Sequence, residues 1–425
     1  MQTVSLEVGT EGAITSNNQN EALDIFMTMN TKGVNLGAGD IVKGLIFQAI
    51  LENKAGVALH TKSDELLKEW QSIMENLDQG DLDQSLRHFF LGRSDSNFQI
   101  PGIIDMAKLI IKDETLTKES NASQLLADIK RMSEVYREIL APDLTVADKD
   151  DRSANEAILC LNRVNSSFRI LMLALQNPSV KSPATTSAEL LKMTRHIESL
   201  VQRWQITGGN AQELEDLFRS LAFEFNEGRV TVESLCASLL AKMPSDEDVE
   251  REIRKPISDA TLSRVILFRL HQYLGDVSRF LPFDTNKTDV EHIAPKTPTD
   301  DWMKTLGRKS SDDGVDDPDS YEYLAEMIGN KTLLEEHINN QLKQKSYLEK
   351  CNGTEVTIKK KTYVFPGYQK SAVEMTQDIA KLTAWDDQMI TRRTEWVKDC
   401  FLEIFQPTRP PSNLRSFYDW NSTTS

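Results

Sequence analysis

The sequence predicts a mainly α-helical protein, a helical bundle region followed by a small α+β part in the C-terminal third. Between about residues 60 and 285, apolar residues recur with the 3.6-residue period of amphipathic helices. A clear example is ELLKMTRHIESLVQRW, residues 189–204. After Phe280 the composition changes to mixed β-branched and turn residues, which indicates short strands and loops. A length of 425 residues exceeds one typical domain, so we expect two or three.

At the N-terminal end, residues 3–8 predict a short strand, and residues 21–30 and 40–50 predict two helices. Asp40 stands at the start of the second helix, where its carboxylate can cap free backbone N–H groups. Further helices are predicted at residues 125–140, 157–175, 214–225 and 257–274. Their breaks fall at Pro142, Pro178, Pro183, Gly208, Gly209 and Pro244. No fixed-period repeat aligns, which disfavours a solenoid.

The C-terminal third contains two segments of opposite charge. Residues 299–328 hold nine acidic against three basic residues, a net charge of −6. Residues 329–370 hold eight lysines against four glutamates, a net charge of +4 that includes the run Lys359–Lys361. The whole chain has a net charge of −16, which argues against a nucleic-acid-binding surface over the entire protein. Any DNA site must therefore be local. Residues 376–405 return to helical spacing, and residues 406–425 predict a flexible tail.

The cysteines and the hydropathy pattern suggest a cytoplasmic protein. The four cysteines lie far apart and form no Cys-x-x-Cys pair, which favours reduced structural thiols over zinc ligands or disulfides. No run approaches the roughly 18 to 20 apolar residues that span a membrane, so no membrane partner is expected. The start MQTVSLEVG lacks the features of a signal peptide.

The stretch DVEHIAP, residues 289–295, combines residue types suited to phosphodiester hydrolysis. That reaction needs a base to activate water and a metal held by hard oxygen ligands, and histidine can be the base near neutral pH. On a strand, Asp289 and Glu291 would face one way, and Val290 and His292 the other. A bend here would bring a Glu291 oxygen to a metal while His292 faces the water.

A second stretch, IGNKTLLEEHINN at residues 328–340, carries asparagines at a fixed spacing. If a turn begins at Gly329 and a helix follows, Asn330 can orient the loop that bears His292. Asn339 would then bring a neutral oxygen ligand from the helix to Mg²⁺. Beyond it, three lysines could hold phosphates: Lys343, Lys345 and Lys350.

Each of these residues also has an ordinary structural interpretation. His292 can be a strand histidine with routine hydrogen bonds, and Asn330 a turn residue. Asn339 can belong to a helix C-terminus. His337 is interpreted as a solvent-facing helix residue, and the run Lys359–Lys361 as a solvated edge.

The order of these motifs resembles the ββα-metal nucleases of the HNH type. More closely, it resembles the C-terminal domain of modification-dependent restriction endonucleases of the GmrSD type and the phosphorothioate-sensing SspE type. The resemblance covers about residues 286–400 and rests on EHIAP, Trp302, IGNKTLL, Asn339, SYLEK, YQKS, Trp385, Ile390, Arg393 and Trp396. It implies an HNH-like ββα-metal nuclease domain.

The resemblance also implies roles for single residues. His292 would be the general base and Asn330 the asparagine that orients its loop. Glu291 or Asp289, together with Asn339, would lie on the side of a Mg²⁺ or Mn²⁺ ion. Lys350 would contact a DNA phosphate. Glu291 stands where many HNH enzymes have aspartate.

Residues 26–47, FMTMNTKGVNLGAGDIVKGLIF, resemble the segment that closes the ParB/sulfiredoxin-like N-terminal domain of the same proteins. In the family, that domain senses modified DNA and hydrolyses nucleotide through a D-G-Q-Q-R motif. No such motif occurs in this sequence, so no nucleotide-binding residue is predicted. We therefore expect a chain that lacks its sensor domain, or one subunit of a split system.

The sequence thus predicts four regions. Residues 1–55 would be the remnant of the sensor domain, 56–285 a helical connecting domain, 286–405 the nuclease, and 406–425 the tail. The predicted function is metal-dependent nicking of DNA, including modified phage DNA, as an effector of antiviral restriction. The alternatives are a non-catalytic scaffold that binds DNA or protein, and half of a nucleotide-switched split system. Self-association is a further open alternative.

Overall fold

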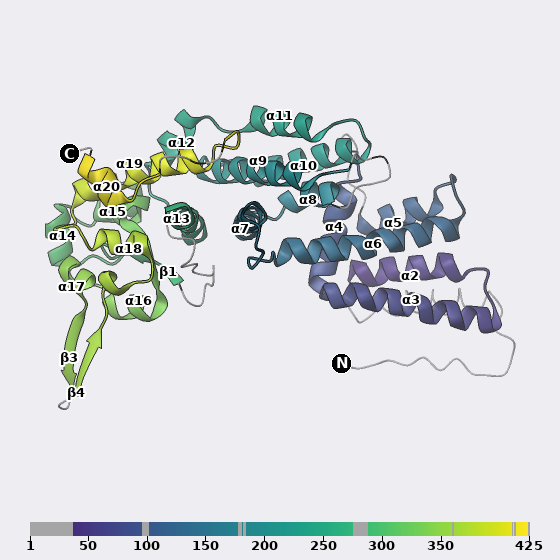
Figure 1. Cartoon of the computed structure of the whole chain (residues 1–425), viewed down its shortest axis with the longest axis horizontal. Helices are drawn as coiled ribbons and strands as arrows, with labels where there is room; N and C mark the ends of the chain where they lie inside the picture. Colours follow the sequence, from purple (N-terminus) through teal and green to yellow (C-terminus); the bar gives the residue numbers. More distant parts are fainter. Residues whose placement is uncertain are drawn as a thin grey trace. The chain divides into compact units, whose positions relative to one another are not determined.

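The computed structural model describes residues 37–95, 102–176, 181, 184–274, 288–358, 361–409, 411 and 414–423. Within these residues the protein is mainly helical with two small antiparallel sheets, which confirms the predicted fold class (Figure 1). The predicted strand at 3–8, the predicted helix at 21–30, and Lys359 and Lys360 lie outside the described residues. No helix of the described part combines the length and apolar character needed to cross a membrane.

The chain divides into two compact units whose boundaries differ from the predicted ones. Unit 1 comprises Met1–Asp143, Ser167–Thr186 and Leu214–Thr231. Unit 2 comprises the remaining segments, Leu144–Ser166, Ser187–Glu213 and Val232–Ser425. The predicted connecting region, residues 56–285, is therefore shared between both units.

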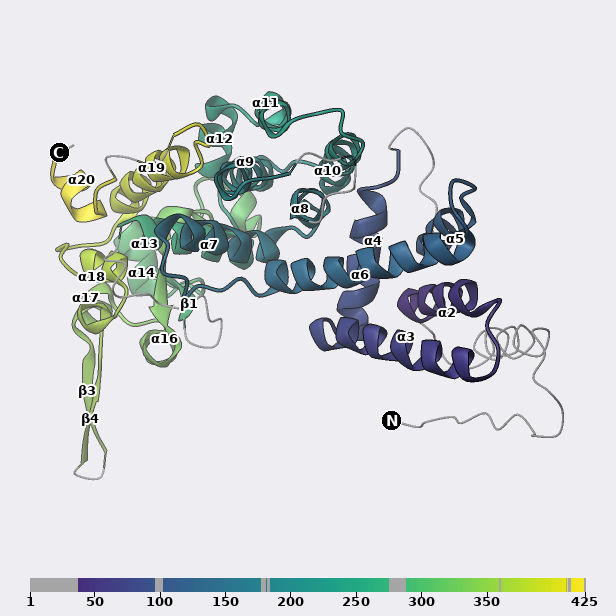
Figure 2. The same ribbon diagram turned by 45° about the vertical axis from the view of Figure 1, so that its right-hand side comes forward.

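Unit 1 is a helical bundle around one long central helix, α6. Its described helices are α2 (Ala38–Leu51), α3 (Gly56–Asn76), α4 (Gln79–Leu91), α5 (Ile103–Lys112), α6 (Lys118–Leu140), α8 (Phe168–Gln176) and most of α10 (Ala211–Asn226). Helix α6 contacts α2, α3, α4, α5 and α8 (Figure 2). Because α2 packs on α6, α5 and α3, the predicted boundary at residue 55 separates helices that share one bundle.

Unit 2 combines helices from the middle of the chain with the C-terminal third. Its helices are α7 (Lys149–Val164), α9 (Ser187–Ile206), α11 (Val232–Lys242), α12 (Asp246–Ile253), α13 (Ala260–Leu274), α14 (Asp300–Leu306), α15 (Tyr321–Glu326), α16 (Glu336–Leu342), α17 (Tyr347–Asn352), α18 (Glu374–Ile379), α19 (Asp387–Ile404) and α20 (Phe417–Thr423). The single helix predicted at 157–175 is two helices, α7 and α8. The break begins at Asn165, which has extended backbone and is followed by two serines that favour turns over helix interiors.

Each sheet of the described chain has two strands. Strands β1 (Thr288–His292) and β2 (Lys331–Glu335) pair antiparallel, with Val290 opposite Leu333 and His292 opposite Lys331. Strands β3 (Thr354–Ile358) and β4 (Lys361–Phe365) also pair antiparallel. In Figures 1 and 2 this second pair extends away from helices α16 and α17.

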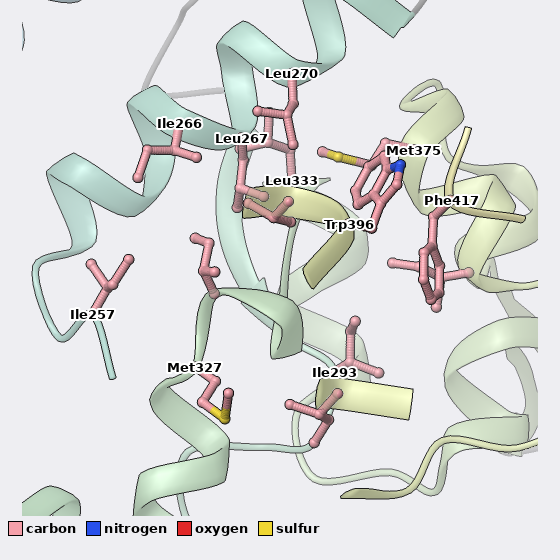
Figure 3. Close-up of a cluster of buried hydrophobic side chains, with 14 of the residues drawn as sticks. Ile257, Ile266, Leu267, Leu270, Ile293, Met327, Leu333, Met375, Trp396 and Phe417 are labelled. Carbon is pink, nitrogen blue, oxygen red and sulfur yellow. The ribbon is translucent and has the colours of Figure 1, made fainter. Parts of the chain in front are cut away.

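One hydrophobic core of unit 2 joins α13 and α19 to the C-terminal third and supports the β1–β2 pair (Figure 3). Ile266, Leu267 and Leu270 of α13 share this core with Ile293, which follows β1, and Leu333 of β2. Trp396 of α19 lies in the same core, as its apolar helical spacing suggested. Because every member is removed from water, the core fixes β1 and β2 against α13.

The predicted flexible tail is corrected for residues 414–423. Helix α20 contacts α18 and α19, and its first residue, Phe417, is 1% exposed. The ring centroids of Phe417 and Trp396 are 5.6 Å apart, and Trp396 Nε1 donates a hydrogen bond to the carbonyl of Arg415 at 3.0 Å. Aromatic burial at two positions therefore outweighs the proline-rich and polar composition that predicted fraying.

Candidate active site at the end of strand β1

His292 is the last residue of β1, at the point where the chain leaves the sheet. Apolar contacts of the strand with the core hold its backbone, and pairing with Lys331 of β2 sets its register. Its side chain is 20% exposed, so water can reach the imidazole. The chain then turns through Ile293 and Ala294 to Pro295, whose missing N–H group cannot extend the strand.

Asn330 holds this turn in place through all of its side-chain hydrogen-bonding groups. Its amide nitrogen donates to the carbonyls of Ala294 (2.8 Å) and Ala325 (2.9 Å). Its amide oxygen accepts from the N–H of Ala294 (2.9 Å) and from Trp385 Nε1 (3.1 Å). The backbone carbonyl of Asn330 also accepts from Ile293 N at 2.9 Å. Asn330 thus lies where a residue that orients the histidine loop is needed, and its buried amide touches no solvent.

A buried carboxylate, Glu326, lies beside the imidazole. His292 Nε2 is 3.5 Å from Glu326 Oε2, and the same oxygen accepts a hydrogen bond from Lys331 Nζ at 2.6 Å. The ammonium of Lys296 lies 2.8 Å from the other oxygen, Oε1. Burial alone would raise the pKa of Glu326, but hydrogen bonds from His292, Lys296 and Lys331 hold it well below its usual range. Glu326 is therefore ionised at neutral pH.

Glu291 is engaged on the interior side of β1. Its Oε1 atom accepts from Lys350 Nζ at 2.5 Å and from the hydroxyl of Tyr368 at 2.9 Å. Lys350 also donates to the backbone carbonyl of His292 at 2.9 Å. Burial lowers the pKa of Lys350 and raises that of Tyr368. The expected phosphate contact by Lys350 is corrected here, because its ammonium is buried and bound to internal acceptors.

Asn339 and Asp289, which were also expected at the site, have different surroundings. Asn339 lies half-buried on α16, a helix that packs against β1, and its side chain makes no hydrogen bond to a described residue. Asp289 Oδ1 is bound by Arg264 at 2.5 Å and by the N–H of Val290 at 2.8 Å. These bonds direct Asp289 toward α13 rather than toward a metal.

The remaining lysines and the second histidine lie further along the chain. Lys345 donates to Thr354 Oγ1, and Lys343 is exposed at the end of α16 with a φ of 39°. His337 is exposed on the same helix. The structure therefore brings His292, Glu291 and Asn330 together around the end of β1.

Sequence reasoning missed four polar residues of this region: Glu326, Lys331, Lys296 and Tyr368. Two of them lie in stretches that carry the family resemblance, Lys331 in IGNKTLL and Tyr368 in YQKS. Glu326 falls in the acidic segment 299–328, and its sequence distance from His292 gave no signal. Lys331 of β2 pairs with His292 of β1 and binds Glu326 through its ammonium, which brings the carboxylate beside the imidazole.

Glu291 and Asn339 each carry an oxygen donor of the kind that hard divalent cations take. Within the described segments, no three His, Cys, Asp or Glu side chains form a group that could hold a metal by themselves. The Oε2 atom of Glu291 accepts no hydrogen bond from any described residue, and the amide of Asn339 is likewise open. One carboxylate and one amide suit Mg²⁺, which usually keeps several waters and takes substrate phosphate oxygens.

Part of the chain matches a known protein family. Residues 243–398 match the family described as GmrSD restriction endonucleases, C-terminal domain. This range contains β1, β2, α16 and all the polar residues described above. No curated protein matches the chain. The matched segment begins at the end of α11, which agrees with the grouping of α12 and α13 with the C-terminal third.

Proposed function

We propose, on the premise that residues 243–398 form a C-terminal domain of the GmrSD restriction endonuclease type, that the chain is a metal-dependent DNA endonuclease of the HNH type. The observation that carries the proposal is His292 itself. It ends a strand, keeps a water-accessible imidazole, and is backed by the ionised carboxylate of Glu326. This is the arrangement that a general base for water requires.

In the proposed reaction, His292 takes a proton from a water molecule as the water oxygen attacks the scissile phosphorus. The bond from phosphorus to the 3′ oxygen breaks, and the 3′ oxygen leaves with the bonding electron pair and takes a proton from solvent. The product is a nick in one strand with a 3′ hydroxyl and a 5′ phosphate. Asn330 keeps the histidine loop in place during this step. Lys350 and Tyr368 fix the side chain of Glu291.

Glu291 and Asn339 are the residues that would hold a Mg²⁺ or Mn²⁺ ion. When bound, such an ion supplies charge neutralisation at the phosphate and at the leaving oxygen. For contact with the DNA backbone, the exposed lysines are better placed than Lys350. Lys296 is 69% exposed and stands four residues after His292 in the chain. Lys343 is exposed at the end of α16.

We place this activity in antiviral restriction of phage DNA, including modified DNA, in the cytoplasm. The match to a restriction endonuclease domain supports that role. A sensor domain or a partner subunit would then select the DNA.

The test is nicking of supercoiled plasmid by the full chain with Mg²⁺ or Mn²⁺, beside His292→Ala and an EDTA control. His337→Ala is the matched control, because it removes an exposed histidine of the same domain. We expect metal-dependent nicking that is lost in His292→Ala and kept in His337→Ala. Equal nicking by the two variants would overturn the assignment of His292. Absence of nicking on plain and modified DNA with both metals would favour a binding scaffold instead.

A further inference from the structure

Glu326 ends helix α15, and the residue is 3% exposed although its carboxylate carries charge. Three nitrogen atoms surround it, from His292 at 3.5 Å, Lys331 at 2.6 Å and Lys296 at 2.8 Å. One lysine would be enough to neutralise a buried carboxylate. The third partner, an imidazole at the edge of solvent, suggests that the carboxylate has a role beyond charge balance.

We propose that Glu326 is a positioning residue that keeps the proton of His292 on Nε2 and leaves Nδ1 free to accept a proton from water. The inference rests on the proposed function, in which His292 is the general base. It adds a residue that determines which of the two ring nitrogens can act.

The tautomer follows from the chemistry of the partners. A carboxylate held by two ammonium groups is ionised, and an ionised carboxylate can only accept hydrogen bonds. The ring nitrogen that faces it must therefore be the N–H donor. No described residue donates to or accepts from Nδ1 of His292, so this second nitrogen is free for water. The distance of 3.5 Å is at the outer limit of a hydrogen bond, and catalytic hydrogen bonds are commonly long before substrate binds.

The carboxylate is also held rigidly, which a positioning residue requires. Lys331 is almost fully buried and donates to the carbonyl of Ile257 at 2.5 Å as well as to Glu326. The backbone carbonyl of Glu326 accepts from Ile257 N at 3.0 Å. The segment before α13 thus anchors both the main chain and the side-chain partner of Glu326.

A test must separate this role from simple neutralisation of Lys331. Replacing Glu326 alone would leave a buried ammonium without its partner, which can unfold the domain. The informative pair is therefore Lys331→Met alone against Glu326→Met combined with Lys331→Met. Both variants lack the buried ammonium, and they differ only in the carboxylate. Urea unfolding checks that each variant folds.

The first readout is the tautomer of His292, from long-range proton–nitrogen correlation spectra of protein labelled with ¹⁵N-histidine. The His292→Ala spectrum identifies the signal among the six histidines. We expect the Nε2–H form to predominate in Lys331→Met and a mixture of both tautomers in the double variant. An unchanged tautomer ratio would overturn the proposal. This readout needs no cleavage of DNA, so it decides the role of Glu326 even if the chain proves not to be a nuclease.

The second readout is plasmid nicking by the same two variants. We expect kcat to be about 10- to 100-fold lower in the double variant than in Lys331→Met, by analogy with the carboxylates that orient metal-bound histidines. KM should change less than kcat, because Glu326 does not touch DNA in the proposed site and Lys296, its exposed partner, keeps its charge. An equal kcat in both variants, or a loss confined to KM, would overturn the positioning role.

Discussion

Lys350 and Glu291 form a buried ion pair in which the ammonium lies 2.5 Å from the carboxylate. The pair joins α17 to β1, and its lysine also binds the carbonyl of His292 at 2.9 Å. A lysine in a basic segment of a DNA-cleaving domain would ordinarily be assigned to the phosphate backbone. Here its position makes it part of the scaffold of the site, and the two roles predict different behaviour.

Substitution of Lys350 by methionine should therefore destabilise the protein. Glu291 would keep only the Tyr368 hydroxyl as a partner, and loss of one member of a buried ion pair costs about 3–5 kcal/mol. We expect the free energy of unfolding, measured in urea, to fall by that amount. Lys343→Met is the control, because Lys343 is exposed and should change stability by no more than about 0.5 kcal/mol. Unchanged stability of Lys350→Met with weaker DNA binding would restore the phosphate role.

Substitution of Asn330 by alanine should destabilise the turn that carries His292. The change removes four hydrogen bonds, with Ala294 N, Ala294 O, Ala325 O and Trp385 Nε1. Each buried group left without a partner costs about 1–3 kcal/mol, so we expect a loss of more than about 2 kcal/mol in urea unfolding. Asn340→Ala, at an exposed position, serves as the control. Equal stability of the two variants would show that water replaces the amide.

Several features of this site follow from sequence because the relevant contacts are local or are set by strand pairing. EHIAP and IGNKTLL each contain a strand end, and a two-residue side-chain period fixes which residues share a face. Asn330 immediately precedes β2, so pairing of β1 with β2 places it beside the histidine turn. The long helices carry strong 3.6-residue periodicity, and most of them form where expected.

Other features depend on packing between segments distant in sequence. Lysines are rarely buried, so the sequence gives no reason to place Lys350 and Lys331 in the interior. Their burial is stabilised by Glu291 and Glu326, which come from separate elements. The division into two units has the same origin, because α12 and α13 have ordinary amphipathic sequences. Only their contacts with α19, β1 and β2 assign them to the C-terminal third.

Acid should weaken unit 2 through Glu395 of α19. A bidentate pair with Arg254, at 2.6 and 2.8 Å, lowers the pKa of Glu395 from 4.5 to about 2. A carboxyl whose folded pKa is depressed contributes stability above pH 4.5, and this contribution is lost as the pH falls toward 2. We expect the melting temperature of Glu395→Gln to fall less steeply than that of the unmodified protein below pH 4.5.

The control for this experiment is Glu247→Gln, at an exposed position of α12. It removes one acidic group from unit 2 without breaking a described ion pair. Its melting temperature should follow the unmodified protein over the whole pH range. Parallel curves for Glu395→Gln and the unmodified protein would contradict the role of the Arg254 pair.

Gly329 should tolerate no side chain, because it lies against the backbone of α19. A Cβ atom at this position would overlap the carbonyl oxygen of Ile390 and both the N and Oγ1 atoms of Thr394. Backbone atoms of a buried helix cannot move aside as a flexible side chain can, so we expect Gly329→Ala to cost about 3 kcal/mol or more.

Gly307 provides a contrast. A Cβ atom there meets no other atom, and its φ of 62° alone limits substitution. Gly307→Ala should cost about 1–2 kcal/mol, the penalty of a left-handed conformation. Urea unfolding of the two variants separates the two effects. Gly329→Ala as stable as Gly307→Ala, or more stable, would contradict this expectation. The Asn330 turn would then pack on α19 more loosely than the structure shows. Asn330 could not hold the His292 loop as rigidly as the proposed mechanism requires.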